Sequence, residues 1–120
     1  MKYITGPRIL YLYYYNYFRS QRANIAKGTA RGLCYLHANN IIHGDIKSCN
    51  ILLDRYFEAK IGDLGLARGG SNDSQLSWRQ VSTIAGTSWY LPDDYLRNFQ
   101  LHVSVDTFGY GIVLYEIVTG

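Results

Sequence analysis

The last segment of the chain constrains its fold most strongly, because apolar side chains cover almost every side of it. The apolar residues of segment 105–119 are Phe108, Tyr110, Ile112, Val113, Leu114, Tyr115, Ile117 and Val118. These positions cannot share a single stripe of a helix, and a helix that is apolar all round normally has packing partners on every side. We therefore predict a central helix at residues 105–119, in a chain of 120 residues that is long enough for one small domain.

Composition narrows the class of protein. Residues 112–118 are interrupted by Glu116 and are far too short to span a membrane. An apolar stretch follows Lys2, but its many tyrosines make a poor secretion signal and no small-residue cleavage site follows. The net charge of +3 comes without a run of basic residues, so nucleic-acid binding has no support. We expect a cytoplasmic protein with no membrane span, in which Cys34 and Cys49 are reduced thiols.

Local patterns predict a helix followed by a hairpin. Residues 22–38 follow a helical period, with core positions at Ile25, Thr29, Leu33 and Leu36. Asn39 and Asn40 predict the end of this helix, because Asn tolerates the left-handed conformation that is common there. A short apolar run at 51–53, a turn at 54–55 and the pair Lys60-Ile61 then predict a small β-hairpin.

The segment 67–88 has a different composition. It is rich in Gly, Ser and Thr, which predicts a long mobile loop without regular structure between two chemical motifs. The following Pro92, Asp93 and Asp94 predict the start of a helix, because Pro suits the first turn and acidic residues suit its positive end.

Two polar clusters carry side chains that phosphoryl transfer can use, and the first of them occupies residues 43–50. Asp45, in a tight loop, can orient a hydroxyl group and accept its proton as the oxygen attacks phosphorus. Lys47 can offset the charge on the transferring phosphoryl group. Asn50 and, in the second cluster, Asp63 supply the hard oxygen ligands that Mg²⁺ prefers. Together they form a plausible phosphoryl-transfer site.

Each of these residues also has a simpler interpretation when it is taken alone. His43 would more often be a packed or capping histidine, Asp45 a turn cap and Lys47 a solvated surface charge. Residues 63–65 would more often be an ordinary turn, although Gly65 would also let the backbone direct Asp63 toward a metal. The order and spacing of the whole set favour the phosphoryl-transfer site over these separate interpretations.

These motifs resemble those of eukaryotic protein kinases. Residues 43–50 resemble the kinase catalytic loop, and 63–65 resemble the magnesium-binding DFG triplet. Residues 86–94 resemble the substrate-site loop and the APE region, and 105–111 resemble the start of the central helix of the large lobe. The His-Gly-Asp and Tyr-Leu-Pro-Asp-Asp sequences look most like the Pelle and interleukin-1-receptor-associated kinases. The resemblance covers residues 20–120.

The resemblance implies a fold and a function. The fold expected is mainly α with short β-hairpins, an incomplete protein-kinase-like large lobe at residues 20–120 after an atypical tyrosine-rich segment at 1–19. The activity expected is ATP-dependent phosphorylation of Ser and Thr hydroxyls in a protein substrate, with ATP and Mg²⁺, in intracellular innate-immune or receptor signalling. A signalling adaptor or receptor complex would be engaged through regions outside this chain.

The resemblance also implies a role for individual residues. Asp45 would be the catalytic base, Lys47 would contact phosphate, and Asn50 and Asp63 would be the magnesium ligands. Leu52 would pack under the adenine ring of ATP, a role that is compatible with simple core packing.

Three further residues would support the site. Thr87 would hydrogen-bond Asp45 and Lys47 in the Ser/Thr-kinase pattern. Asp106 would brace the backbone of the catalytic loop, and His43 would stabilise the same loop from within it.

The chain departs from the family pattern at several positions. Gly44 replaces the arginine that normally pairs with a phosphorylated activation loop, so charge-assisted ordering through that residue is not expected. Leu64 and Asp94 replace the usual Phe and Glu. No glycine-rich loop and no V-A-I-K lysine precede Arg22, so we expect very weak ATP binding and turnover by this polypeptide alone. The alternative function is therefore a catalytically dead, truncated kinase fragment that acts only as an interaction module.

Overall fold

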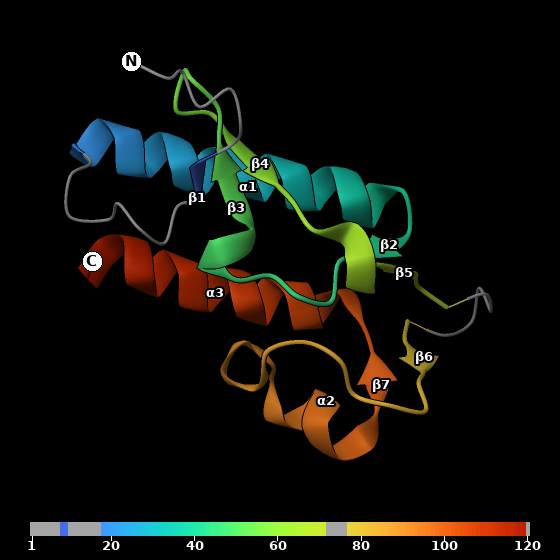
Figure 1. Cartoon of the computed structure of the whole chain (residues 1–120). Helices are drawn as coiled ribbons and strands as arrows, with labels where there is room; N and C mark the ends of the chain where they lie inside the picture. The colour runs from blue at the N-terminus through green and yellow to red at the C-terminus, as the bar shows by residue number, and fades with distance from the viewer. Residues whose placement is uncertain (1–7, 10–17, 72–76, 120) are drawn as a thin grey trace.

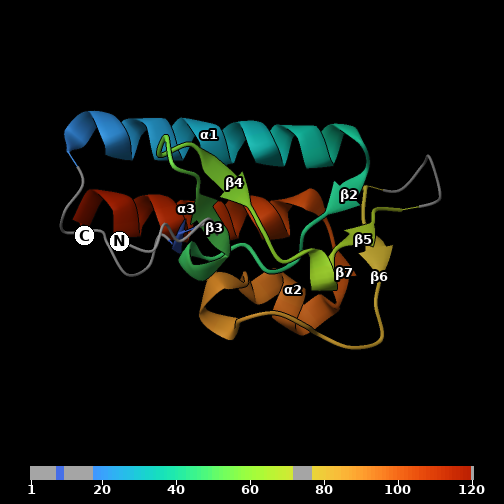
Figure 2. The same ribbon diagram turned by 45° about the horizontal axis from the view of Figure 1, so that its top comes forward.

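The computed structural model describes residues 8–9, 18–71 and 77–119. Most of the tyrosine-rich segment, and with it the candidate secretion signal, lies outside these residues. The described chain is built from helices and short antiparallel strand pairs, and its two long helices lie side by side in opposite directions (Figures 1 and 2). The predicted fold class, mainly α with short β-hairpins, is confirmed.

The first long helix, α1, spans Arg19–Ala38 and begins three residues before the predicted start. Its buried residues are Ile25, Thr29, Leu33 and Leu36, the four that the sequence period predicted. Asn40 follows the helix with a φ of 56°, so the expected left-handed Asn is present at its end. The chain then enters the two-residue strand β2, Ile41–Ile42.

The predicted hairpin is also present. Strands β3 (Ile51–Leu53) and β4 (Ala59–Ile61) pair antiparallel, with Leu52 opposite Lys60. The strand β1, Arg8–Ile9, adds to the other edge of β3. The hairpin lies across α1 (Figure 1), and Ile51 and Leu53 are fully buried.

The second long helix, α3 (Val103–Thr119), is the core helix that the sequence predicted, but only one of its faces is buried. The buried positions recur at spacings of one to four residues, at Val105, Asp106, Gly109, Val113 and Ile117. Phe108, Tyr115 and Val118 remain 41%, 69% and 77% exposed. The expectation of packing on every side is therefore wrong for the described residues, because the buried positions of α3 all fall on one stripe of the helix.

The prediction that segment 67–88 lacks regular structure is wrong at two places, near its start and at residues 79–80. Strand β5 (Arg68–Gly69) pairs with β2, and β6 (Arg79–Gln80) pairs with β7 (Gln100–Leu101). Backbone hydrogen bonds to the distant strands β2 and β7 fix the segment at these two places. Residues 72–76 lie outside the described part of the chain.

The short helix α2 (Asp93–Asn98) begins directly after Pro92, as predicted. It lies on the opposite side of α3 from α1 (Figures 1 and 2). A second apolar cluster joins α2 to β2, β7 and α3, and consists of Ile42, Val81, Leu91, Tyr95, Leu101 and Val105. Among the described residues, no helix is both long and apolar enough to cross a membrane, and both cysteines are free thiols.

Candidate active site

The polar loop at residues 43–50 crosses the buried face of α3 and is fixed there by Asp106. This carboxylate is fully buried and accepts hydrogen bonds of 2.8 Å from the backbone N–H groups of His43 and Gly44. The ring Nε2 of His37, in the last turn of α1, lies 2.8 Å from Asp106 Oδ2. Gly44 has a φ of 83°, so glycine at this position avoids the strain that a side chain would bring. The loop backbone is thus fixed by a carboxylate on the core helix.

His43 joins the two polar clusters. Its Nδ1 accepts a 3.1 Å hydrogen bond from the backbone N–H of Asp45, and its Nε2 lies 2.8 Å from the carbonyl oxygen of Gly62. A carbonyl can only accept and an N–H can only donate, so the geometry corresponds to a neutral ring with its proton on Nε2. His43 is fully buried. The interpretation of a packed histidine therefore holds, and the packing ties the loop to the residue before Asp63.

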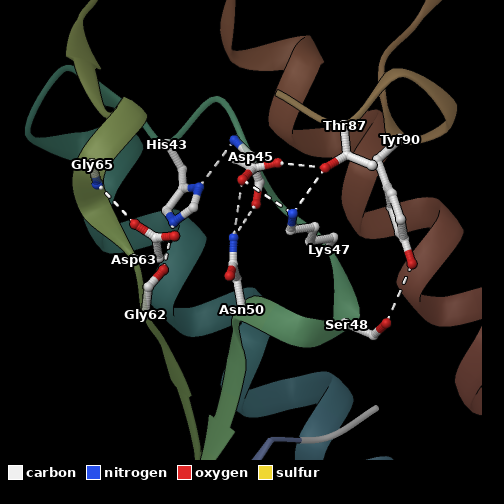
Figure 3. Close-up of polar contacts among 10 residues, drawn as sticks. All are labelled: His43, Asp45, Lys47, Ser48, Asn50, Gly62, Asp63, Gly65, Thr87 and Tyr90. Atoms are coloured by element: carbon white, nitrogen blue, oxygen red, sulfur yellow. Dashed lines mark hydrogen bonds and ion pairs between the residues drawn. The ribbon is translucent and has the colours of Figure 1, made fainter. Parts of the chain in front are cut away.

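Asp45, Lys47, Asn50 and Thr87 form one hydrogen-bonded cluster (Figure 3). The hydroxyl group of Thr87 donates to Asp45 Oδ1 at 3.2 Å and accepts from Lys47 Nζ at 2.9 Å. Lys47 Nζ lies 3.5 Å from Asp45 Oδ2. The Lys47 side chain is 23% exposed and the Asp45 side chain is 10% exposed. Asn50 Nδ2 donates to the backbone oxygen and to Oδ2 of Asp45, at 2.8 and 3.3 Å. These contacts orient the Asp45 carboxylate from several sides.

The two predicted magnesium ligands differ in their surroundings. The Asn50 amide donates through Nδ2, and within the described chain its Oδ1 accepts no hydrogen bond. Asp63 is exposed, and its Oδ1 accepts from the backbone N–H of Gly65 at 3.2 Å. No group of three His, Cys, Asp or Glu side chains in the described residues could hold a metal. Mg²⁺ takes most of its ligands from water and phosphate, so one carboxylate and one amide oxygen fit its needs.

The expectation about Gly65 needs a correction. The left-handed residue of this turn is Asp63 itself, with a φ of 53°. A Cβ atom on Gly65 would lie 3.1 Å from Asp63 Oδ1, so Gly65 allows a close approach of backbone to carboxylate.

Leu52 is half-buried on β3, and its Cδ1 would lie 2.5 Å from a Cβ atom added at Gly62. Leu52 therefore packs over the strand that leads to Asp63.

Sequence reasoning missed a second group of residues beneath the loop. Ser48 Oγ lies 3.2 Å from the phenolic oxygen of Tyr90, and the Tyr90 hydroxyl donates a short hydrogen bond to Glu116 of α3. Burial, followed by the hydrogen bond to Glu116, raises the pKa of Tyr90 to about 12. Neither Ser48 nor His37 had a sequence signal, because their partners are 42 and 69 residues away along the chain.

Comparison with known proteins agrees with this geometry. The family described as the protein kinase domain matches residues 7–120. Protein BRASSINOSTEROID INSENSITIVE 1 of Arabidopsis thaliana is 47% identical over 105 residues, which cover 84% of this chain. Serine/threonine-protein kinase BRI1-like 2 of the same plant is 46% identical over 104 residues, or 83% of this chain. Interleukin-1 receptor-associated kinase 1 of Mus musculus is 45% identical over 107 residues, also 83% of this chain.

The chain belongs to the protein kinase family. It spans 8%, 9% and 15% of the length of these three relatives. The matched range begins inside the tyrosine-rich segment, so a domain boundary at residue 20 stays a prediction.

Proposed function

We propose that the site transfers a phosphoryl group from ATP to a Ser or Thr hydroxyl of a protein substrate. The observation that carries this proposal is the cluster in which Lys47, Asn50 and Thr87 all contact the Asp45 carboxylate. Phosphoryl transfer requires positioning and charge stabilisation more than covalent chemistry from the protein. The cluster offers both, because it holds a carboxylate in one orientation with an ammonium group beside it.

Each residue has a defined part in the proposed reaction. Asp45 orients the substrate hydroxyl and takes its proton. Lys47 places its positive charge beside the transferring group. Asn50 and Asp63 would hold Mg²⁺, whose positive charge would offset the negative charge of the phosphates. Leu52 would contact the adenine ring, and Thr87, Asp106 and His43 hold the loop in place.

The assignment to Ser/Thr phosphorylation rests on Lys47 and on its bond to Thr87. The relative BRI1-like 2 is named a serine/threonine-protein kinase, which supports the same class. We propose in addition a Pelle-like protein that works in the cytoplasm within a receptor or innate-immune signalling complex, with no nucleic-acid partner. The similarity to interleukin-1 receptor-associated kinase 1 supports this finer assignment.

A noncatalytic interaction module is the second candidate function. The observation in its favour is the exposed apolar face of α3 at Phe108, Tyr115 and Val118. Such a face is the kind of surface on which another polypeptide packs. It does not require any of the polar contacts around Asp45.

One experiment distinguishes the two functions. The purified chain is incubated with radiolabelled ATP, Mg²⁺ and a generic basic protein, and the product is hydrolysed to identify the labelled amino acid. We expect a low level of label on Ser and Thr, because ATP binding by this polypeptide alone is expected to be weak, and we expect Asp45→Asn to remove it. Label on Tyr would contradict the Ser/Thr assignment. Equal background signals from both proteins would overturn catalysis by this polypeptide and favour the interaction module.

A further inference from the structure

Ser48 lies in the catalytic loop, but its side chain takes no part in the cluster around Asp45. It follows Lys47 directly, in the 3-10 turn Ser48–Asn50 (η3), and is fully buried. Its hydroxyl lies 3.2 Å from the phenolic oxygen of Tyr90. Figure 3 shows Ser48 and Tyr90 meeting away from the contacts of Asp45.

The direction of this hydrogen bond follows from the partners of Tyr90. A phenol has one proton, and Tyr90 donates it to Glu116. The hydroxyl of Ser48 must therefore donate to the Tyr90 oxygen. The result is a directed chain of hydrogen bonds from the catalytic loop to a carboxylate on α3, in which Tyr90 is only 5% exposed.

Lys47 and Ser48 are adjacent in the loop at residues 43–50, and both bond the same turn at residues 87–90. Lys47 bonds Thr87, and Ser48 bonds Tyr90. Thr87 and Tyr90 are joined by a 2.9 Å hydrogen bond between their backbones, at the 3-10 turn Ser88–Tyr90 (η5). Because Thr87 also bonds Asp45, a shift of this turn would change the orientation of the Asp45 carboxylate.

We propose that Ser48 is a positioning residue, which fixes the turn at residues 87–90 so that Thr87 and Lys47 hold Asp45 in its reactive orientation. This inference rests on the proposed phosphoryl transfer. Ser48 acts through Tyr90 and contacts no reacting atom, so its loss reduces the rate of the chemical step. The affinity for ATP does not depend on it.

The test compares Ser48→Ala with a matched control. We expect kcat to fall about 3- to 10-fold, the effect of one neutral hydrogen bond, with KM for ATP unchanged. The control is Thr29→Val, which removes a fully buried hydroxyl group that bonds Ile25 within α1, away from the site. It is expected to leave kcat unchanged even where it lowers the melting temperature. A kcat for Ser48→Ala equal to that of the wild type would overturn the inference while leaving the proposed function standing.

Coupling to Tyr90 gives a second check. In a Tyr90→Phe background the Ser48 hydroxyl loses its Tyr90 acceptor, so Ser48→Ala should cause no further fall in kcat. A full and independent fall in that background would show that Ser48 acts by another route and would contradict the inference.

Hydrogen exchange tests the inference without any activity. The Tyr90 amide bonds the Thr87 carbonyl, so it should exchange about 3- to 10-fold faster in Ser48→Ala, with no change in Thr29→Val. If the wild type shows no phosphorylation, the proposed function fails, and this exchange result still decides whether Ser48 fixes the turn. Unchanged exchange at Tyr90 would overturn the positioning role.

Discussion

The Oδ1 atom of Asp106 accepts a 2.8 Å hydrogen bond from the backbone N–H of Gly44, which lies 62 residues earlier in the chain. The carboxylate belongs to the core helix α3, and the amide belongs to the loop that carries Asp45. The conformation of the loop is therefore set from the core. A backbone with a φ of 83° at Gly44 persists because this bond and its neighbour at His43 hold it there.

Asp106→Asn should destabilise the chain by about 2–4 kcal/mol, because an amide group would place a donor against one of the buried N–H groups. Urea unfolding measures this change. Asp93→Asn is the matched control, because its ion pair with Arg97 is 78% exposed on both sides, and it should change stability by less than about 0.5 kcal/mol. A loss below about 1 kcal/mol for Asp106→Asn would show that the loop does not depend on this carboxylate.

Two glycines of α3 should respond in opposite ways to alanine. A Cβ atom on Gly109 would lie 2.7 Å from the carbonyl oxygen of Ile46, so Gly109→Ala should push the catalytic loop away and cost about 1–3 kcal/mol. A Cβ atom on Gly111 would meet no described residue within 4 Å. Gly111→Ala should therefore stabilise the helix by about 0.5–1 kcal/mol. Thermal unfolding of both variants checks this, and equal shifts would refute the close packing at Gly109.

The raised pKa of Tyr90 predicts a loss of stability at alkaline pH. The folded chain keeps this proton up to about pH 12, whereas the unfolded chain releases it near 10.0. The folded state therefore binds more protons between these values, and its stability falls as the pH rises through them. The wild type should lose about 1 kcal/mol more than Tyr90→Phe between pH 9 and pH 11.

Urea unfolding at the two pH values makes this comparison. Burial also raises the pKa of Tyr110, but both proteins retain that residue and its effect cancels. Parallel pH dependence in the two proteins would mean that Tyr90 ionises as freely in the folded chain as in the unfolded one.

Asp63→Asn tests the proposed magnesium site. Loss of the anionic ligand should raise the Mg²⁺ concentration for half-maximal phosphorylation by about tenfold or more. Glu58→Gln removes an exposed carboxylate from the β3–β4 turn and should leave that concentration unchanged. An identical Mg²⁺ requirement in the wild type and Asp63→Asn would exclude Asp63 as a ligand.

Local sequence patterns predicted the parts of the fold that local interactions determine. The buried positions of α1 follow from their helical spacing, and the start of α2 follows from Pro92 and two acidic residues. The strands β5 and β6 could not be predicted in the same way. Each consists of two residues and forms only because a distant strand supplies its hydrogen bonds.

The same division applies to the site. Asp45, Lys47 and Asn50 belong to one short motif, and the kinase resemblance placed Thr87 beside them. The roles of His37 and Ser48 depend on which long-range partner each side chain meets after packing. Nothing in their immediate sequence distinguishes these side chains from surface polar residues.

The central claim is that Asp45 makes this loop a phosphoryl-transfer site. The most direct measurement is the initial rate of Mg²⁺-dependent phosphorylation by the wild type and by Asp45→Asn, with both proteins shown by circular dichroism to be folded. Loss of the general base should lower the rate by about 10²–10⁴-fold, whereas Thr29→Val should retain it. A rate for Asp45→Asn equal to that of the wild type would contradict the claim.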